Sequence, residues 1–210
     1  AAGRVPPGTR PPSPRPTRPR IPPGSGRESA GATDWRTRLL DSMVKVIRWI
    51  DRVAEWTGRI VALLCFPLVL ALTYEVIARY LFRAPTEWAY DVTYMLYGTI
   101  FMLAAAFTLL KKGHIRTDLF YTNWPPRKQG AVDAAMYLLF YFPGIIFFLV
   151  AGWDYAAHSW ATAERAALSP WRPILYPFKT VIPVAAVLLL LQGVSELLKS
   201  LYAAKRGEWL

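Results

Sequence analysis

Ionisable side chains within long apolar segments are the residues of this sequence best placed to do chemistry. The apolar segment 58–80 contains Glu75, and Arg79 follows it four residues later, which is the favourable order for an ion pair on a helix. An ionisable residue in a membrane-spanning helix is by default a candidate functional residue. Because Glu75 lies within about a turn and a half of the predicted outer end of its helix, where Arg79 can reach lipid headgroups, a structural pair or subunit contact is favoured.

A second carboxylate belongs to the next apolar segment. Asp91 follows Trp88 by three residues, near the same outer surface. An ion pair between Asp91 and either Arg79 or Arg83 would satisfy two groups that are costly to bury.

Polar residues also occur near the inner end of the last apolar segment, where Gln192, Ser195 and Glu196 stand within five residues. Contact with a neighbouring helix is their favoured role. None of the polar groups in the apolar segments forms a proton relay along a plausible path, so we expect no enzyme activity.

The segment from Lys111 to Asp118 directly follows the second apolar segment. Lys111 and Lys112 complement the dipole at a helix C-terminus, and Gly113 suits a left-handed cap. His114 has no second His or Cys near it, which favours a local or partner hydrogen bond over metal ligation. Asp118 is a candidate cap for a short interfacial helix.

Cysteine and histidine usage restricts cofactor chemistry. The single cysteine, Cys65, cannot form an internal disulfide, a CxxC pair or a cysteine-based zinc site. Both histidines, His114 and His158, are expected in loops, whereas haem in a membrane anchor usually needs axial ligands on the spanning helices. We therefore expect no cofactor, and the membrane anchor of a redox enzyme is kept as the alternative function.

Four apolar segments must position these residues. Each is close to the ~20 residues that a helix needs to cross ~30 Å of hydrocarbon. They occupy residues 58–80, 88–110, 131–152 and 180–198. The sequence therefore predicts an all-α membrane protein, with a four-helix transmembrane domain over residues 57–200 and a short cytoplasmic tail at 201–210.

Two different segments precede the spans. Residues 1–34 are rich in Pro and Arg and nearly lack large apolar side chains, so we expect a disordered tail. Residues 35–56 alternate apolar and charged positions at helical spacing, and Trp35, Trp49 and Trp56 accompany a basic polar face. This pattern predicts an amphipathic helix that lies in the membrane interface or packs on a partner protein.

The charge of the chain indicates its orientation. The 210 residues are 54% hydrophobic with a net charge of +11. A nucleic-acid-binding protein would account for the charge but not for the apolar segments. With the N-terminus inside, fourteen of the basic residues flanking the predicted helices lie on the inner side and five on the outer side. We expect both termini in the cytoplasm of a bacterium, with the spans in its inner membrane and no nucleic-acid partner.

The loop at 153–179 is then the only sizeable outward-facing element. It carries five aromatic residues that predict an interfacial belt or a docking surface. They are Trp153, Tyr155, Trp160, Trp171 and Tyr176.

Three motifs over residues 36–200 resemble the small membrane subunit of tripartite ATP-independent periplasmic (TRAP) transporters. They are Thr86-Glu87-Trp88-Ala89-Tyr90-Asp91, Phe101-Met102-Leu103-Ala104-Ala105-Ala106 and Gly113-His114-Ile115-Arg116-Thr117-Asp118. That family typically shows a Trp with an acid three residues on, a Leu-Gly-Ala-Ala stretch and a His-Ile-Arg-Val-Asp motif. Here Asp91 stands where Glu is common, Ala104 replaces the Gly and Thr117 replaces the Val. The later segments 169–173, 177–179 with Lys179, and 191–193 with Gln192 also look like the family.

The resemblance implies a division of labour. A periplasmic solute-binding protein captures an organic acid, a large multi-span permease subunit moves it with sodium, and the small subunit braces the stationary scaffold of the permease. Sodium is then expected on the large subunit, and the small subunit meets the lipid bilayer. The segments 94–99 and 169–173 look most like the subtype for 2-oxo acids, mannitol or chloroaromatic acids. The resemblance and the residue chemistry together make eight residues candidates for subunit contacts or structural contacts. They are Glu75, Arg79, Trp88, Asp91, His114, Asp118, Lys179 and Gln192.

Overall fold

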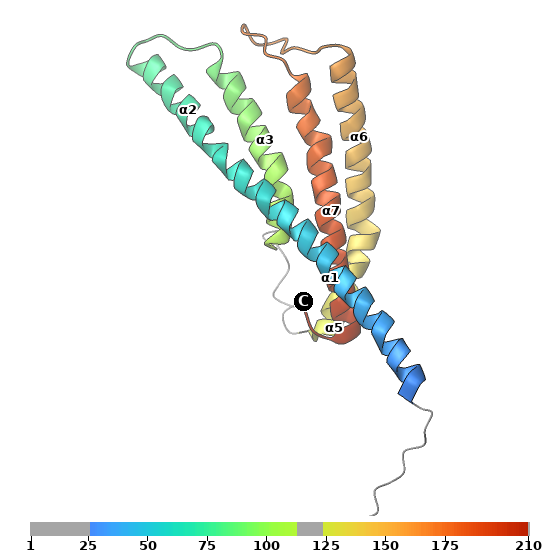
Figure 1. The fold of residues 1–210 in the computed structure, drawn as a ribbon. Helices are drawn as coiled ribbons and strands as arrows, with labels where there is room; N and C mark the ends of the chain where they lie inside the picture. The colour runs from blue at the N-terminus through green and yellow to red at the C-terminus, as the bar shows by residue number, and fades with distance from the viewer. Residues whose placement is uncertain (1–25, 113–123, 210) are drawn as a thin grey trace, which may run out of the picture. The chain divides into compact units, whose positions relative to one another are not determined.

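The computed structural model describes residues 26–112 and 124–209, and these residues are helical apart from short loops. Within these ranges there is no β-strand, and one isolated antiparallel bridge joins Arg165 to Ile174. The elements are α1 (Gly26–Leu63), α2 (Cys65–Tyr80), α3 (Ala89–Leu110), α5 (Pro126–Met136), the π-helical turn η1 (Tyr137–Tyr141), α6 (Phe142–Ala161) and α7 (Tyr176–Arg206). The predicted all-α architecture is confirmed (Figure 1).

Four helical stretches of the described chain are long and apolar enough to cross a membrane. They are Leu40–Tyr80, Ala89–Leu110, Pro126–Ala161 and Tyr176–Arg206. This result confirms the number of predicted spans and lengthens the first, third and fourth of them.

The chain divides into two units, residues 1–40 and 41–210. In the first unit, residues 1–25 lie outside the described residues, and with them most of the predicted disordered tail. Helix α1 begins at Gly26, so residues 26–34, which the sequence assigned to the tail, are helical. The composition agrees with this start, because the last proline of the tail is Pro23 and residues 26–34 include two alanines and a glutamate, which favour helix.

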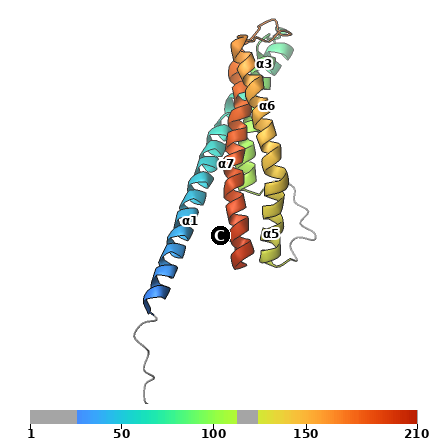
Figure 2. The same ribbon diagram turned by 90° about the vertical axis from the view of Figure 1, so that its right-hand side faces the viewer.

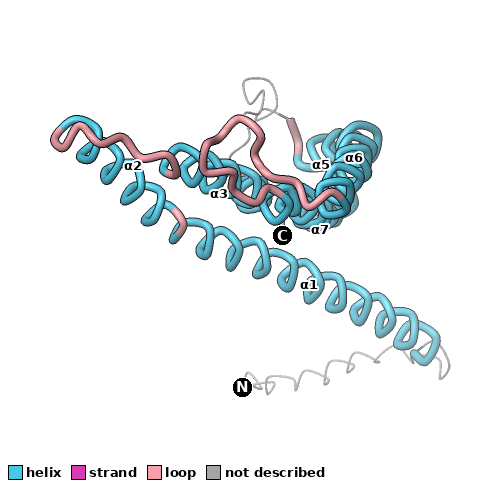
Figure 3. The backbone as a smooth tube through the Cα atoms, turned by 90° about the horizontal axis from the view of Figure 1, so that it is seen from above, coloured by secondary structure: helices cyan, strands magenta, loops and turns pink. Residues whose placement is uncertain are grey.

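Helices α1 and α2 are nearly one continuous rod. Pro67 lacks an amide hydrogen and its ring crowds the carbonyl of Leu63, and the regular helix is interrupted at Leu64 (Figure 3). The predicted amphipathic segment 35–56 is therefore not a separate element but the middle of α1. At 1.5 Å per residue the 41 residues from Leu40 to Tyr80 extend over about 60 Å, twice the hydrocarbon thickness of a bilayer.

Helix α7 is the centre of the second unit. It packs against α3, α5 and α6, and α2 packs against α3 (Figures 1 and 2). Small residues let the helices approach. A Cβ atom at Gly130 of α5 would lie 2.5 Å from the carbonyl oxygen of Ser200 on α7, and one at Gly152 of α6 would lie 2.8 Å from Cγ2 of Ile182. At Gly130 the neighbouring atoms belong to the backbone of α7 and at Gly152 to a side chain of α7, and such small residues are common where membrane helices pack closely.

The third span contains a π-helical turn with an identifiable cause. Pro143 cannot donate to the carbonyl of Leu139, and the preceding residues 137–141 adopt the wider turn. Tyr141 lies in this turn and donates a hydrogen bond of 2.8 Å from Oη to the carbonyl oxygen of Leu189 on α7. A Cβ atom at Gly193 would lie 2.4 Å from the Tyr141 ring. The turn thus fixes α6 to α7 within the apolar layer.

The loop between α6 and α7 is shorter than predicted. It covers residues 162–175, so Trp153, Tyr155, Trp160 and Tyr176 belong to helices and only Trp171 lies in the loop. His158 was expected in a loop but lies in the last turn of α6, where its side chain is exposed. The predicted span ended at residue 152 because polar residues and large aromatic residues follow it and lower the hydropathy. Such residues do not end a helix, so α6 continues.

Candidate functional site

The polar residues gather at the two ends of the bundle. The loop end carries the loops 81–88 and 162–175, and the terminal end carries the last residues of α3 and α7. At the loop end Glu75 binds Arg79, whose Nε lies 2.8 Å from Glu75 Oε1. The other carboxylate oxygen accepts the backbone N–H of Thr86 at 3.1 Å and also the Thr86 hydroxyl. Glu75 therefore fastens the α2–α3 loop to α2 as well as pairing with Arg79.

Trp88 and Asp91 hold the start of α3. The Trp88 ring stacks on Tyr74 of α2 with centroids 5.6 Å apart. The carboxylate of Asp91 is buried, with 8% of the residue exposed, and accepts a hydrogen bond from the hydroxyl of Ser169. The expected pairing of Asp91 with Arg79 or Arg83 is wrong, because the loop 162–175 reaches over and supplies a neutral donor instead.

Internal contacts order the loop 162–175. The N–H of Ala166 donates to the carbonyl of Pro173, and the N–H of Leu175 donates to the carbonyl of Glu164, both at 3.0 Å. Together with the Ser169 contact to Asp91, these bonds tie the loop at both of its ends and near its tip. The Leu168 side chain at the tip is fully exposed.

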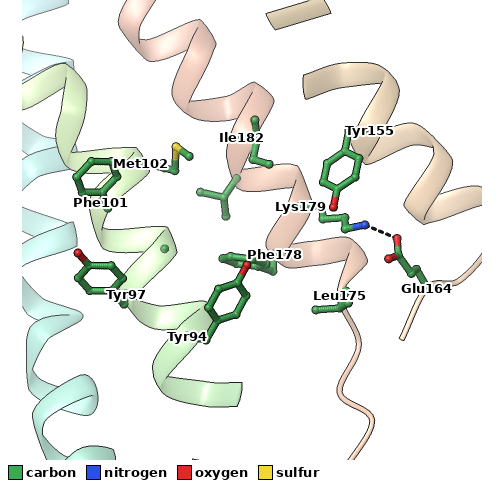
Figure 4. Close-up of a pocket in the computed structure, with 12 residues that line it drawn as sticks. Tyr94, Tyr97, Phe101, Met102, Tyr155, Glu164, Leu175, Phe178, Lys179 and Ile182 are labelled. Carbon is green, nitrogen blue, oxygen red and sulfur yellow. Dashed lines mark hydrogen bonds and ion pairs between the residues drawn. The ribbon is translucent and has the colours of Figure 1, made fainter. Parts of the chain in front are cut away.

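An aromatic cavity of about 420 Å³ lies between α3 and α7 near the loop end (Figure 4). The ring of Phe178 reaches from α7 towards α3, where a Cβ atom at Gly98 would lie 2.8 Å from Phe178 Cζ. Tyr94 packs on the same ring with centroids 5.4 Å apart. The remaining lining residues are Tyr97, Phe101, Met102, Tyr155, Glu164, Leu175, Lys179, Val181 and Ile182.

Lys179 and Glu164 form the one charged pair of this cavity. Lys179 is only 7% exposed, and its ammonium binds the Glu164 carboxylate and lies 3.9 Å from the centroid of the Tyr155 ring. The hydrogen bond from Lys179 lowers the pKa of Glu164 below its usual range. The pair thus joins three elements: the loop through Glu164, α6 through Tyr155 and α7 through Lys179.

A second charged cluster joins α1 to α7 near the terminal end. Asp51 Oδ1 accepts hydrogen bonds from Ser195 Oγ at 2.7 Å and from Gln192 Nε2 at 3.1 Å. The ammonium of Lys199 lies 2.8 Å from Asp51 and 2.8 Å from Glu196. Gln192, Ser195 and Glu196 are thus brought to a neighbouring helix.

Sequence reasoning missed Asp51 and Glu164 in these clusters. Asp51 looks like one of many charges on the polar face of an amphipathic helix. A signal was present on α7, because Gln192, Ser195 and Lys199 recur on one helical face and need a polar partner when that face is buried. No comparable signal marks Glu164, which lies in a loop.

The remaining candidates do not form a reactive centre. His114 and Asp118, with the predicted cap at Gly113 and the short interfacial helix, lie outside the described residues. In residues 26–112 and 124–209 no group of three or more His, Cys, Asp or Glu side chains could hold a metal ion. What the described polar groups can do is lock loops and helices together.

A family model supplies the comparison with known proteins. The model described as "Tripartite ATP-independent periplasmic transporters, DctQ component" matches residues 68–202, which include α3, α6 and nearly all of α7. No curated protein matches the chain.

Proposed function

The chain belongs to the DctQ family, the small membrane component of TRAP transporters, and on that premise we propose that it braces the large permease and does not itself carry the solute. In such systems the DctQ component works with a large permease and a periplasmic binding protein. The family and the four apolar helices indicate a multi-pass protein of the inner membrane. Membership of this family favours a transporter subunit over the alternative function, the membrane anchor of a redox enzyme.

One observation carries the bracing role. The two charged clusters on α7 are separated by residues 180–191, which are apolar except for Thr180. That distance is about 20 Å along a helix. The hydroxyl of Thr180 accepts a hydrogen bond from Trp160 and donates one to the carbonyl of Tyr176. Within the described chain, α7 therefore offers no ladder of polar groups along which an ion or a carboxylate could pass.

The exposed apolar surface supports partner binding. The apolar windows of the first three spans are at most 11% buried within this chain, against 39% for the window in α7. Faces of this kind contact either lipid or another membrane protein. A brace needs such faces, because it has to bind the scaffold of the permease along the length of its helices.

The orientation follows from charge. With the terminal end in the cytoplasm, the basic residues around α1 and after α3 and α7 lie inside, as the distribution of Lys and Arg favours. The loop end then faces the periplasm. The ordered loop 162–175 with its exposed Leu168 is there available to the solute-binding protein. The solute is an organic acid moved with sodium, and the sodium sites belong to the permease.

Co-purification tests the bracing role. A tagged copy of the full chain is expressed with the permease of its own system and extracted in mild detergent. We expect the permease to be retained in a fixed ratio to the chain. The permease of an unrelated transport system, expressed in the same way, serves as the matched control and should be lost. A correctly folded chain that retains neither permease contradicts the proposal.

A further inference from the structure

Two adjoining cavities lie at the terminal end, where α1, α3 and α7 approach one another. Their volumes are about 340 Å³ and about 370 Å³. They share Arg48, Asp51 and Leu110 as lining residues. The first cavity is completed by Arg52, Glu55 and Lys111, and the second by Val44, Ile47, Lys112, Glu196, Lys199 and Trp209.

The carboxylates around these cavities already have cationic partners. Lys199 binds both Asp51 and Glu196 at 2.8 Å. Glu55 is paired with Arg59 at 3.0 Å, and Arg59 does not line either cavity. The acidic groups are thus engaged by a lysine that they share and by an arginine outside the cavities.

Four cationic side chains that line the two cavities have no carboxylate partner among the described residues. Among the residues that the structure describes, none of Arg48, Arg52, Lys111 and Lys112 has a carboxylate within ion-pair distance. The ammonium of Lys111 lies 5.5 Å from the centroid of the Phe107 ring, and that of Lys112 lies 4.5 Å from the centroid of the Trp209 ring. A ligand that enters the cavities therefore meets four positive charges that no described carboxylate pairs, which calls for an anion with at least one phosphate-like group.

The neighbouring surface shows what kind of anion fits. The four cations stand at the polar ends of two spans, and exposed apolar side chains follow directly along α1, namely Ile60 and Leu63. The exposed indole rings of Trp49 and Trp56 lie on the same helix, as is common at the level of lipid headgroups. A ligand that continues from the cations along this surface needs a charged head and long apolar chains.

We propose that Arg48, Arg52, Lys111 and Lys112 bind the headgroup of an anionic phospholipid, whose acyl chains follow α1. Basic pockets between membrane helices are suited to anionic headgroups, because juxtamembrane cations attract them and arginine presents a fork that matches phosphate oxygens. The Asp51–Lys199–Glu196 cluster contributes indirectly, since Lys199 neutralises the carboxylates that would otherwise pair with Arg48. The lipid then adds a link between α1 and α3 at the terminal end.

Thermal melting of the full chain in neutral detergent micelles tests the site. Phosphatidylglycerol is titrated into the micelles and should raise the melting temperature in a saturable way. Phosphatidylcholine, which has a phosphate but no net charge, should raise it much less. Inorganic phosphate is the third arm, and it distinguishes a lipid site from a site for a free anion.

A pair of double variants assigns the effect to these residues. Arg48→Gln with Lys112→Gln should raise the phosphatidylglycerol concentration at half-effect about tenfold or more, whereas Arg48→Lys with Lys112→Arg should restore it nearly to the wild-type value. The matched control is Lys45→Gln with Lys128→Gln, which removes the same charge from exposed sites outside the cavities and should leave the titration unchanged.

Three outcomes overturn the proposal. They are equal stabilisation by phosphatidylcholine, equal stabilisation by inorganic phosphate, and an unchanged titration in the Arg48 and Lys112 double variant. Because the chain is tested without the permease, none of these outcomes bears on the bracing role.

Discussion

At the scale of single residues, the molecule uses charge to close contacts rather than to move protons. Glu164 is the best placed of these charges for a test because it lies outside the spans and binds the buried ammonium of Lys179. Its pKa is lowered in the folded protein by the hydrogen bond from Lys179. The stabilisation is therefore complete above the unfolded pKa, near 4.5, and is lost as the pH falls through the lower folded value.

We predict that Glu164→Gln lowers the melting temperature at pH 7 and makes it depend less on pH below about 4.5. The reason is that the variant has already lost the carboxylate that wild-type protein protonates on acidification. Melting curves in detergent between pH 7 and pH 3 measure the effect. Glu87→Gln, at an exposed position, is the control and should keep the wild-type pH dependence. The same acid sensitivity in Glu164→Gln as in the wild type would refute this role.

The sequence predicted contacts of short range better than contacts of long range. Glu75 and Arg79 are four residues apart on one helix, and their ion pair follows from helical geometry alone. Asp91 finds its partner Ser169 across 78 residues, and that contact depends on the path of a loop. Asp51 makes a second contact that the sequence did not predict. Helical periodicity places Asp51 on the polar face of its helix, but it does not predict that one edge of this face contacts α7.

At the scale of elements, close approach to α7 governs packing. Gly130 on α5 faces the backbone of Ser200 and Ala204, which cannot rotate away, whereas Gly144 on α6 has no atom within 4 Å of the place where a Cβ would stand. We predict that Gly130→Ala destabilises the protein by about 1–3 kcal/mol, because α5 has to move away from α7. Thermal or denaturant unfolding in micelles measures the difference.

Gly144→Ala is the matched control for this substitution, since it adds the same methyl group to open space. It should be neutral or stabilising by up to about 1 kcal/mol, the gain in helix propensity of Ala over Gly. Equal destabilisation by the two substitutions would show that the interface between α5 and α7 is not tightly packed.

Apolar periodicity located the spans but not their ends. The second predicted span, 88–110, agrees with α3 to within one residue at its start and ends at the same residue. Helix α6 extends past residue 152 to Ala161, and α7 extends past residue 198 to Arg206. Polar and aromatic residues at these ends lower the hydropathy but are compatible with a helix. Each of these helices is therefore longer than the apolar segment that predicted it.

At the scale of the whole molecule, our proposal assigns the loop end to the solute-binding protein and the helix faces to the permease. Leu168→Asp places a charge at the exposed tip of the loop 162–175, away from the helix contacts. We predict that it weakens the effect of the solute-binding protein on uptake, because the proposed docking surface includes this loop, while retention of the permease stays unchanged. Uptake at increasing concentrations of binding protein measures the change, and Lys128→Gln at the other end is the control. Normal dependence on binding protein in Leu168→Asp would exclude the loop tip from docking.

The bracing role itself is tested most directly by solute uptake into proteoliposomes. The vesicles contain the permease alone, this chain alone, or both, with the binding protein and its carboxylate ligand outside and a sodium gradient directed inward. We predict uptake only when both membrane subunits are present. Uptake by this chain alone, or full uptake by the permease alone, would contradict the role of a brace that carries no solute.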